Sequence, residues 1–186
     1  MEKYHYDPEE YPNLKRLAGE MIPCLETEAG WQDREIKETF PGRDQSFLAV
    51  GITLGKGIDA LQEKYLQNGF LTESYMIEVL SSELLLKSYR AYTEWVVVHR
   101  NLHVARLHFL GGGEISETSE SQIGSLLRLA NLPMLLQELA LPVTCNTAYC
   151  MIPKKSVVFY AELTKDPFTK CAGICLGCGR RDCPNR

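Results

Sequence analysis

Residues 46–57 read SFLAVGITLGKG, an apolar and partly β-branched run that ends in two glycines. The run from Ser46 to Leu54 predicts a buried strand, because β-branched and apolar side chains pack well on a pleated surface. Gly55 and Gly57 predict a turn that leads into a helix through Leu61 and Leu66. A strand that passes directly into a helix is therefore the first unit of the core.

The residues before this strand differ from it in composition. Residues 1–45 hold eleven acidic and six basic side chains, and four prolines interrupt them. Only the stretch around Asn13 to Met21 predicts a helix. We interpret residues 1–45 as an N-terminal extension packed on a core of residues 46–163, and residues 164–186 as a separate cysteine-rich tail.

A long helix and a second strand are expected after residue 70. Thr72 is a suitable N-cap for a helix whose apolar stripe runs on to Val96. Leu102 to Leu110 predicts a strand. In a regular strand, Arg106 and His108 would share one face with Val104, and the opposite face would hold His103 and Leu107.

Three glycines follow this strand, Gly111, Gly112 and Gly113. Glycines permit positive φ and let backbone amides approach a ligand closely, although the same composition also suits a flexible turn from strand to helix. Two short helices are expected at Ser119 to Leu129 and at Pro133 to Ala140. The clearest strand after them is Ser156 to Leu163.

Size and charge limit the possible functions. The chain has 186 residues and a formal net charge of −4. One domain with an appended tail is the expectation at this length. An acidic chain is a poor match for nucleic acid, since phosphate attracts basic proteins. The polar, acidic start and the lack of a long apolar run predict a cytoplasmic protein without a membrane partner.

The most specific chemical signal is the run Cys171-x3-Cys175-x2-Cys178-x4-Cys183-Pro184. Four thiolates in so short a segment can converge on one metal ion or cluster. The contiguous, proline-terminated spacing favours an iron-sulfur cluster over zinc, because zinc sites usually pair two short turns across a longer loop. Cys145 or Cys150 could replace Cys171 as the fourth ligand.

Four segments, taken in order, resemble the reactivation domain of cobalamin-dependent methionine synthase and the stand-alone proteins related to it. They are Ala49 to Gly55, Arg106 to Gly113, Met151 to Val157 (MIPKKSV), and Cys175-x2-Cys178-x4-Cys183-x2-Arg186. Together they cover the chain from about residue 46 to its end.

This resemblance implies a single α+β domain, with a twisted antiparallel sheet flanked by helices and a cysteine-rich tail. It also implies an accessory role in returning an oxidised corrinoid to its methylated state. The cobalamin would be carried by a partner methyltransferase or corrinoid protein, and a flavodoxin-like or ferredoxin-like donor would supply the electron. S-adenosylmethionine would supply the methyl group, with Arg106, Gly111, Gly112 and Gly113 as candidate binding residues.

The chain departs from the family at this loop. It has four residues between Arg106 and Gly111 where the family has three, and glycine where the family has tyrosine. Arg106 either binds a carboxylate or reaches solvent from the edge of a strand. Two alternatives of other classes stay open: a small iron-sulfur protein for electron transfer or sensing, and a zinc-stabilised interaction module.

Overall fold

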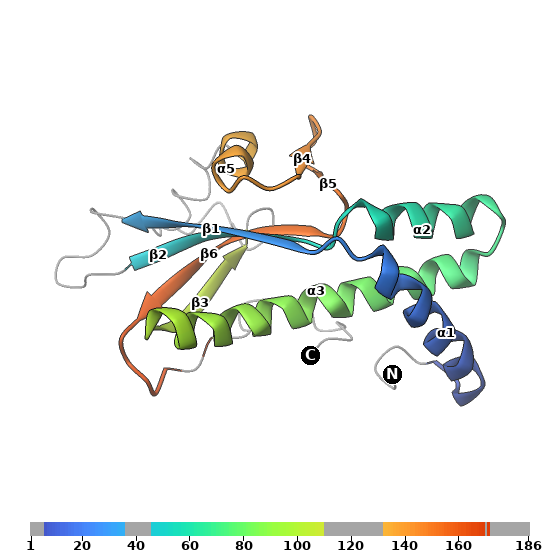
Figure 1. Ribbon diagram of the computed structural model, residues 1–186, viewed down its shortest axis with the longest axis horizontal. Coiled ribbons are helices and arrows are strands. Elements are labelled where there is room, and N and C mark those ends of the chain that lie inside the picture. The colour runs from blue at the N-terminus through green and yellow to red at the C-terminus, as the bar shows by residue number, and fades with distance from the viewer. Residues whose placement is uncertain (1–5, 36–45, 110–131, 170, 172–186) are drawn as a thin grey trace, which may run out of the picture.

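A computed structural model describes residues 6–35, 46–109, 132–169 and 171. The chain forms an α+β domain with one main antiparallel sheet and helices packed around it (Figure 1). The helices are η2 (Pro8–Glu10), α1 (Tyr11–Met21), η3 (Ile22–Cys24), α2 (Lys56–Gln67), α3 (Leu71–Arg100) and α5 (Leu132–Glu138). The strands are β1 (Glu28–Glu35), β2 (Ser46–Thr53), β3 (His103–Phe109), β4 (Thr144–Cys145), β5 (Met151–Ile152) and β6 (Ser156–Thr164).

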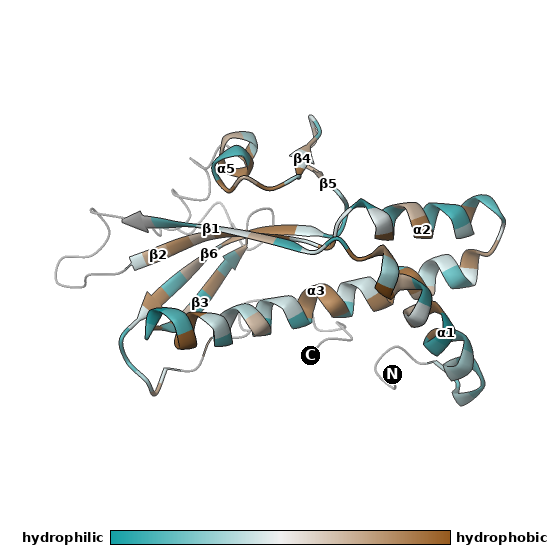
Figure 2. Cartoon of the chain, in the orientation of Figure 1, coloured by the Kyte–Doolittle hydropathy of each residue, from teal (hydrophilic) through white to brown (hydrophobic). Residues whose placement is uncertain are grey.

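The main sheet has the strand order β1-β2-β6-β3, and β4 and β5 form a separate hairpin. All neighbouring strands are antiparallel. The central strands β2 and β6 are buried along almost their whole length, which matches their continuous apolar sequence. Figure 2 shows these two strands mainly in brown. The sheet therefore has two buried central strands, β2 and β6, and two edge strands, β1 and β3.

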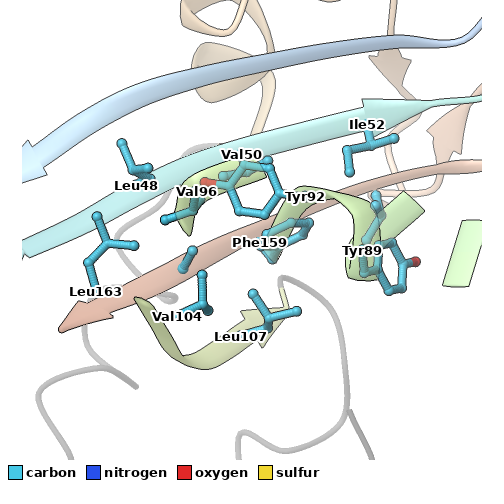
Figure 3. Packing of buried hydrophobic residues seen from close by; sticks show 12 residues of the cluster. Leu48, Val50, Ile52, Tyr89, Tyr92, Val96, Val104, Leu107, Phe159 and Leu163 are labelled. Carbon is cyan, nitrogen blue, oxygen red and sulfur yellow. The ribbon is translucent and has the colours of Figure 1, made fainter. Parts of the chain in front are cut away.

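The long helix α3 covers one face of the sheet, and α5 with the β4–β5 hairpin lies on the other (Figure 1). The core between α3 and the sheet has Phe159 of β6 at its centre, packed against Tyr89 and Tyr92 of α3 (Figure 3). We call it the α3-side core.

The core on the opposite face, which we call the α5-side core, depends on two glycines. Gly30 of β1 and Gly51 of β2 are paired in the register. A Cβ on Gly30 would overlap the Leu139 carbonyl, and one on Gly51 would overlap the Leu141 side chain. The two glycines thus let the segment after α5 pass close to the sheet.

A third cluster joins the helices at one end of the molecule. Leu14, Leu17 and Met21 of α1 are buried against α2 and the first half of α3. Their spacing of three and four residues places them on one helix face, as an amphipathic helix requires. The N-terminal helix is therefore part of the packed structure.

Most of the expected elements are confirmed, with small differences at their ends. The helix around Asn13 to Met21 is α1, the strand Ser46 to Leu54 is β2, the helix after Gly57 is α2, the strand Leu102 to Leu110 is β3, the helix Pro133 to Ala140 is α5, and the strand Ser156 to Leu163 is β6. The helix expected at Ser119 to Leu129 lies outside the described residues.

Two local points differ from expectation. Thr72 is not the N-cap of α3, because the helix begins at Leu71 and Phe70 is the cap residue. The strand β1 was not expected either, because the sequence predicts only the helix around Asn13 to Met21 before Ser46. In the described part of the chain, no helix has the length and apolar character needed to cross a membrane.

Candidate functional site

Arg106 lies on the edge strand β3, where a β-bulge changes the face that it presents. Val104 pairs with Leu163, but Arg106 pairs with Glu162, so Ala105 is an extra residue. Val104 consequently faces the α3-side core together with Leu107. Arg106 lies on the other face, and the expectation that it shares a face with Val104 is wrong, because one inserted residue reverses the alternation of the strand.

The same bulge places His103 and His108 on the same face of the sheet. His103 pairs with Thr164 before the bulge and His108 pairs with Tyr160 after it. Thr164 and Tyr160 lie four residues apart on β6 and hence on one face, so the two histidines also share a face. The expectation of opposite faces held only for a regular strand. Within the described ranges, no group of three potential metal ligands is found.

His108 forms a polar contact inside the α5-side face of the sheet. Its side chain is only 7% exposed, and its Nε2 lies 3.2 Å from Oε2 of Glu162. The Phe47 ring lies beside the imidazole, with the ring centroids 6.3 Å apart. This environment limits the motion of both side chains and holds the Glu162 carboxylate at a defined place on β6.

Arg106 and Glu162 therefore place a positive and a negative side chain at directly paired positions on one face of the sheet. The Arg106 side chain is exposed, and it enters no ion pair with another described residue. Cross-strand pairs on the same face have Cβ atoms within about 5.5 Å of each other. A ligand with both a carboxylate and an ammonium group matches this arrangement, which we call the Arg106–Glu162 site.

The residues Gly111, Gly112 and Gly113 lie outside the described residues. β3 ends at Phe109, two residues before the first of them. Sequence reasoning missed Glu162, although a glutamate inside the apolar run SVVFYAELT is itself a usable signal. A charged side chain is rarely placed in a central strand unless it is paired.

Two other segments of the resemblance, Ala49 to Gly55 and Met151 to Val157, meet at the opposite end of the sheet. The hydroxyls of Thr53 and Ser156 lie 2.8 Å apart, and the Leu54 amide donates to the Lys155 carbonyl at 2.9 Å. The Gly55 amide donates to Thr53 Oγ1 at 3.1 Å. These bonds join the end of β2 to the start of β6 and set the direction of α2.

Lys155 adds a buried charge to this corner. Its side chain is 9% exposed, and its Nζ donates to Glu78 and, at 3.0 Å, to Ser82 Oγ of α3. Glu78 also accepts from Gln62 Nε2 at 3.1 Å. A buried ammonium paired in this way ties β6 to α3, so we assign Lys155 a structural role.

The cysteines of the described chain are distributed over both faces of the sheet. Cys171 is half-buried against the α3-side core, and burial raises the pKa of its thiol. Cys145 packs against the α5-side core, and Cys150 is exposed in the hairpin turn. Cys175, Cys178 and Cys183 lie outside the described residues.

Two of the candidate ligands, Cys171 and Cys145, lie on opposite faces of the sheet. A sheet with side chains on both faces stands between Cys171 and Cys145, and packed layers are about 10 Å apart. Metal-thiolate bonds are about 2.3 Å long, so the two thiols are alternative ligands and not joint ones. Cys171 would also have to leave its apolar surroundings to reach a metal ion.

A scan against protein-family models finds no match for the chain, and a search of curated proteins finds no significant match.

Proposed function

We propose that the protein supports the reductive reactivation and remethylation of a corrinoid-dependent methyltransferase. The proposal rests on the four segments that resemble the methionine synthase reactivation domain. In the reaction, cob(II)alamin on a partner protein takes one electron and becomes cob(I)alamin. Cobalt then attacks the methyl group of S-adenosylmethionine, which yields methylcobalamin and S-adenosylhomocysteine.

The observation that best supports this proposal is the Arg106–Glu162 site. The amino-acid end of S-adenosylmethionine carries one carboxylate and one ammonium group. An arginine is suited to the carboxylate, because its planar guanidinium donates two parallel hydrogen bonds. Glu162 would accept from the ammonium, and His108 would keep its carboxylate in position. The triple glycine follows directly along the chain and would let backbone amides approach the nucleoside.

An iron-sulfur cluster in the tail is part of this proposal, and its function would be electron delivery. Cys171, Cys175, Cys178 and Cys183 are the candidate ligands, with Cys150 or Cys145 in place of Cys171 as the alternative. Because Cys150 is exposed and Cys171 is held in apolar surroundings, the hairpin thiol is the more accessible fourth ligand. The spacing of the tail also supports the second candidate function, a small iron-sulfur protein without a corrinoid partner.

Replacement of Arg106 by glutamine tests the methyl-donor site. We expect the full-length protein to bind S-adenosylmethionine under anaerobic, reducing conditions. Loss of a charge-assisted hydrogen bond costs about 1.5–3 kcal/mol, so Arg106→Gln should weaken binding about 10- to 100-fold. Titration calorimetry measures the affinity.

Arg90→Gln is the matched control for this variant, because Arg90 is also exposed but lies on α3, which covers the opposite face of the sheet from Arg106. It should leave the affinity unchanged. Equal affinity of the two variants would remove Arg106 from the site. The proposed function itself fails if neither S-adenosylmethionine nor reduced cobalamin binds to the wild-type protein.

Metal analysis after anaerobic purification tests the cluster. We expect iron and acid-labile sulfide in the wild-type protein and their loss in Cys178→Ala. Cys24→Ala is the matched control, because Cys24 donates its thiol hydrogen to the Glu20 carbonyl and packs beside α1. Its iron content should equal that of the wild type. Zinc without iron, lost in Cys178→Ala, would reject electron transfer and select the zinc-stabilised module.

A further inference from the structure

The two edges of the main sheet differ in how well they could pair with a further strand. β3 carries a bulge at Ala105, and a bulge twists an edge strand away from a new partner. β1 has eight residues and no proline, and it pairs with β2 in an unbroken register from Glu28 to Glu35. Among the described strands, none pairs with the outer side of β1 (Figure 1). β1 is therefore a long, regular edge that offers its outward backbone groups to another strand.

The side chains of β1 are accessible as well. Five of the six residues from Glu28 to Asp33 are exposed. Trp31 has 44% of its surface exposed, although its ring lies against that of Trp95 of α3, with centroids 4.6 Å apart. Val98 follows Trp95 by three residues, which makes the two neighbours on the helix surface, and Val98 is 76% exposed. An exposed apolar surface thus continues from the middle of β1 onto α3.

The two faces of β1 limit how a second copy of this strand can pair with it. Trp31 contacts Trp95 and so lies on the α3 side of the sheet, and Ala29 and Asp33 share that side because side chains alternate along a strand. The even-numbered residues, from Glu28 on, lie on the opposite side. When two copies pair antiparallel about a two-fold axis perpendicular to the sheet, each residue meets one from the same side. Odd-numbered residues then pair with odd-numbered ones, and even with even.

Only one register of this kind places unlike charges opposite each other within β1. With the axis at Trp31, Glu28 of each copy is paired with Arg34 of the other, and the two Trp31 residues are paired with each other. With the axis one residue to either side, no two charged residues are paired. With the axis at Asp33, two aspartates meet, and like charges directly opposite each other destabilise a sheet. The sequence of β1 is therefore complementary to itself about Trp31.

We propose that the outer edge of β1 binds the same edge of a second copy of this chain, antiparallel and centred on Trp31. The two four-stranded sheets then form one continuous sheet. Backbone hydrogen bonds join the strands, and the two Glu28–Arg34 pairs select the register. Trp31 and Val98 of both copies cover the α3 side of the interface. This proposal goes beyond the proposed function and does not depend on it.

Sedimentation equilibrium of the full-length protein over a wide range of concentrations measures this association. A reducing buffer is used, so that no disulfide through the exposed Cys150 can join two chains. One strand edge and one helix surface form a small interface, so we expect a weak, reversible monomer–dimer equilibrium. A protein that stays monomeric up to several hundred micromolar, or that forms only larger oligomers, overturns the proposal.

Charge reversal tests the register. Glu28→Arg and Arg34→Glu each replace two attractive pairs by two repulsive ones, so each should raise the dissociation constant of the dimer about tenfold or more. The double variant Glu28→Arg/Arg34→Glu again places unlike charges opposite each other and should dimerise as the wild type does. Glu63→Arg is the matched control, because Glu63 is exposed on α2 and the change in charge is the same. It should leave the dissociation constant unchanged.

The double variant keeps the test independent of any loss of folding in a single variant, since its dimer returns only if the two positions face each other. A dimer that neither single variant weakens overturns the proposal. A double variant that dimerises no better than the single variants overturns it as well.

Discussion

Phe159→Ala should lower the free energy of unfolding by about 3–5 kcal/mol, the usual cost of removing a buried phenylalanine ring. Phe159 has no exposed surface and lies at the centre of the α3-side core. Its ring contacts those of Tyr89, Tyr92 and Phe109 at centroid distances of 5.9, 5.5 and 5.4 Å. The cavity would open where β6 meets α3, between elements that cannot move together without breaking the strand pairing.

Urea unfolding followed by circular dichroism measures this loss. Phe168→Ala is the matched control, because Phe168 is 89% exposed and its removal should change stability by no more than about 0.5 kcal/mol. Phe159→Leu should fall between the two, since leucine refills part of the cavity. If Phe159→Ala lowers the free energy of unfolding by less than about 1 kcal/mol, the ring is not the central packing element of the α3-side core.

Gly55→Ala should cost about 3 kcal/mol or more, for two additive reasons. Gly55 has a φ of +85° and a ψ of 173°, a backbone conformation that is essentially restricted to glycine and costs other residues about 1–3 kcal/mol. An added Cβ would also overlap the Glu26 side chain and lie 2.9 Å from the Glu26 carbonyl oxygen. Neither clash can relax easily, because the Glu26 amide is bonded to the Leu54 carbonyl.

Substitutions at two other glycines measure the cost of the backbone conformation and the cost of the steric clash separately. Gly69 has a φ of +79° but nothing within 4 Å of the new Cβ, so Gly69→Ala should cost only the conformational part, about 1–2 kcal/mol. Gly19 lies inside α1 with open space around it, and Gly19→Ala should raise stability by about 0.5–1 kcal/mol. Thermal or urea unfolding should rank the three variants in this order. Equal costs at Gly55 and Gly69 would show that the close approach of Glu26 has no effect.

The elements that could be predicted are those with strong local signals. β2 and β6 are apolar runs bounded by turn residues, and α1 has its apolar residues at helical spacing. Their structure follows from side-chain period and turn chemistry, which act within a few residues of sequence. β1 has the sequence EAGWQDRE and lacks such a signal. It is a strand because β2 pairs with it along its whole length, and pairing partners distant in sequence leave no local pattern.

The candidate site, too, could be predicted only in part from local sequence. Arg106 could be chosen from the sequence, but the face that it presents depends on the bulge at Ala105. Glu162 and His108 lie 54 residues apart, and only the pairing of β3 with β6 brings them to 3.2 Å. The separation of Cys171 from Cys145 likewise depends on which face of the sheet each segment packs against.

The sequence by itself determined the positions of the main helices and of β2, β3 and β6, and the cysteine spacing that points to a metal or cluster. Those features depend on short-range preferences of the chain. The tertiary structure alone decided the bulge in β3, the Arg106–Glu162 site and the contact between the Trp31 and Trp95 rings. Each of these depends on strand register and on helix-to-sheet packing, where a shift of one residue exchanges buried and exposed side chains.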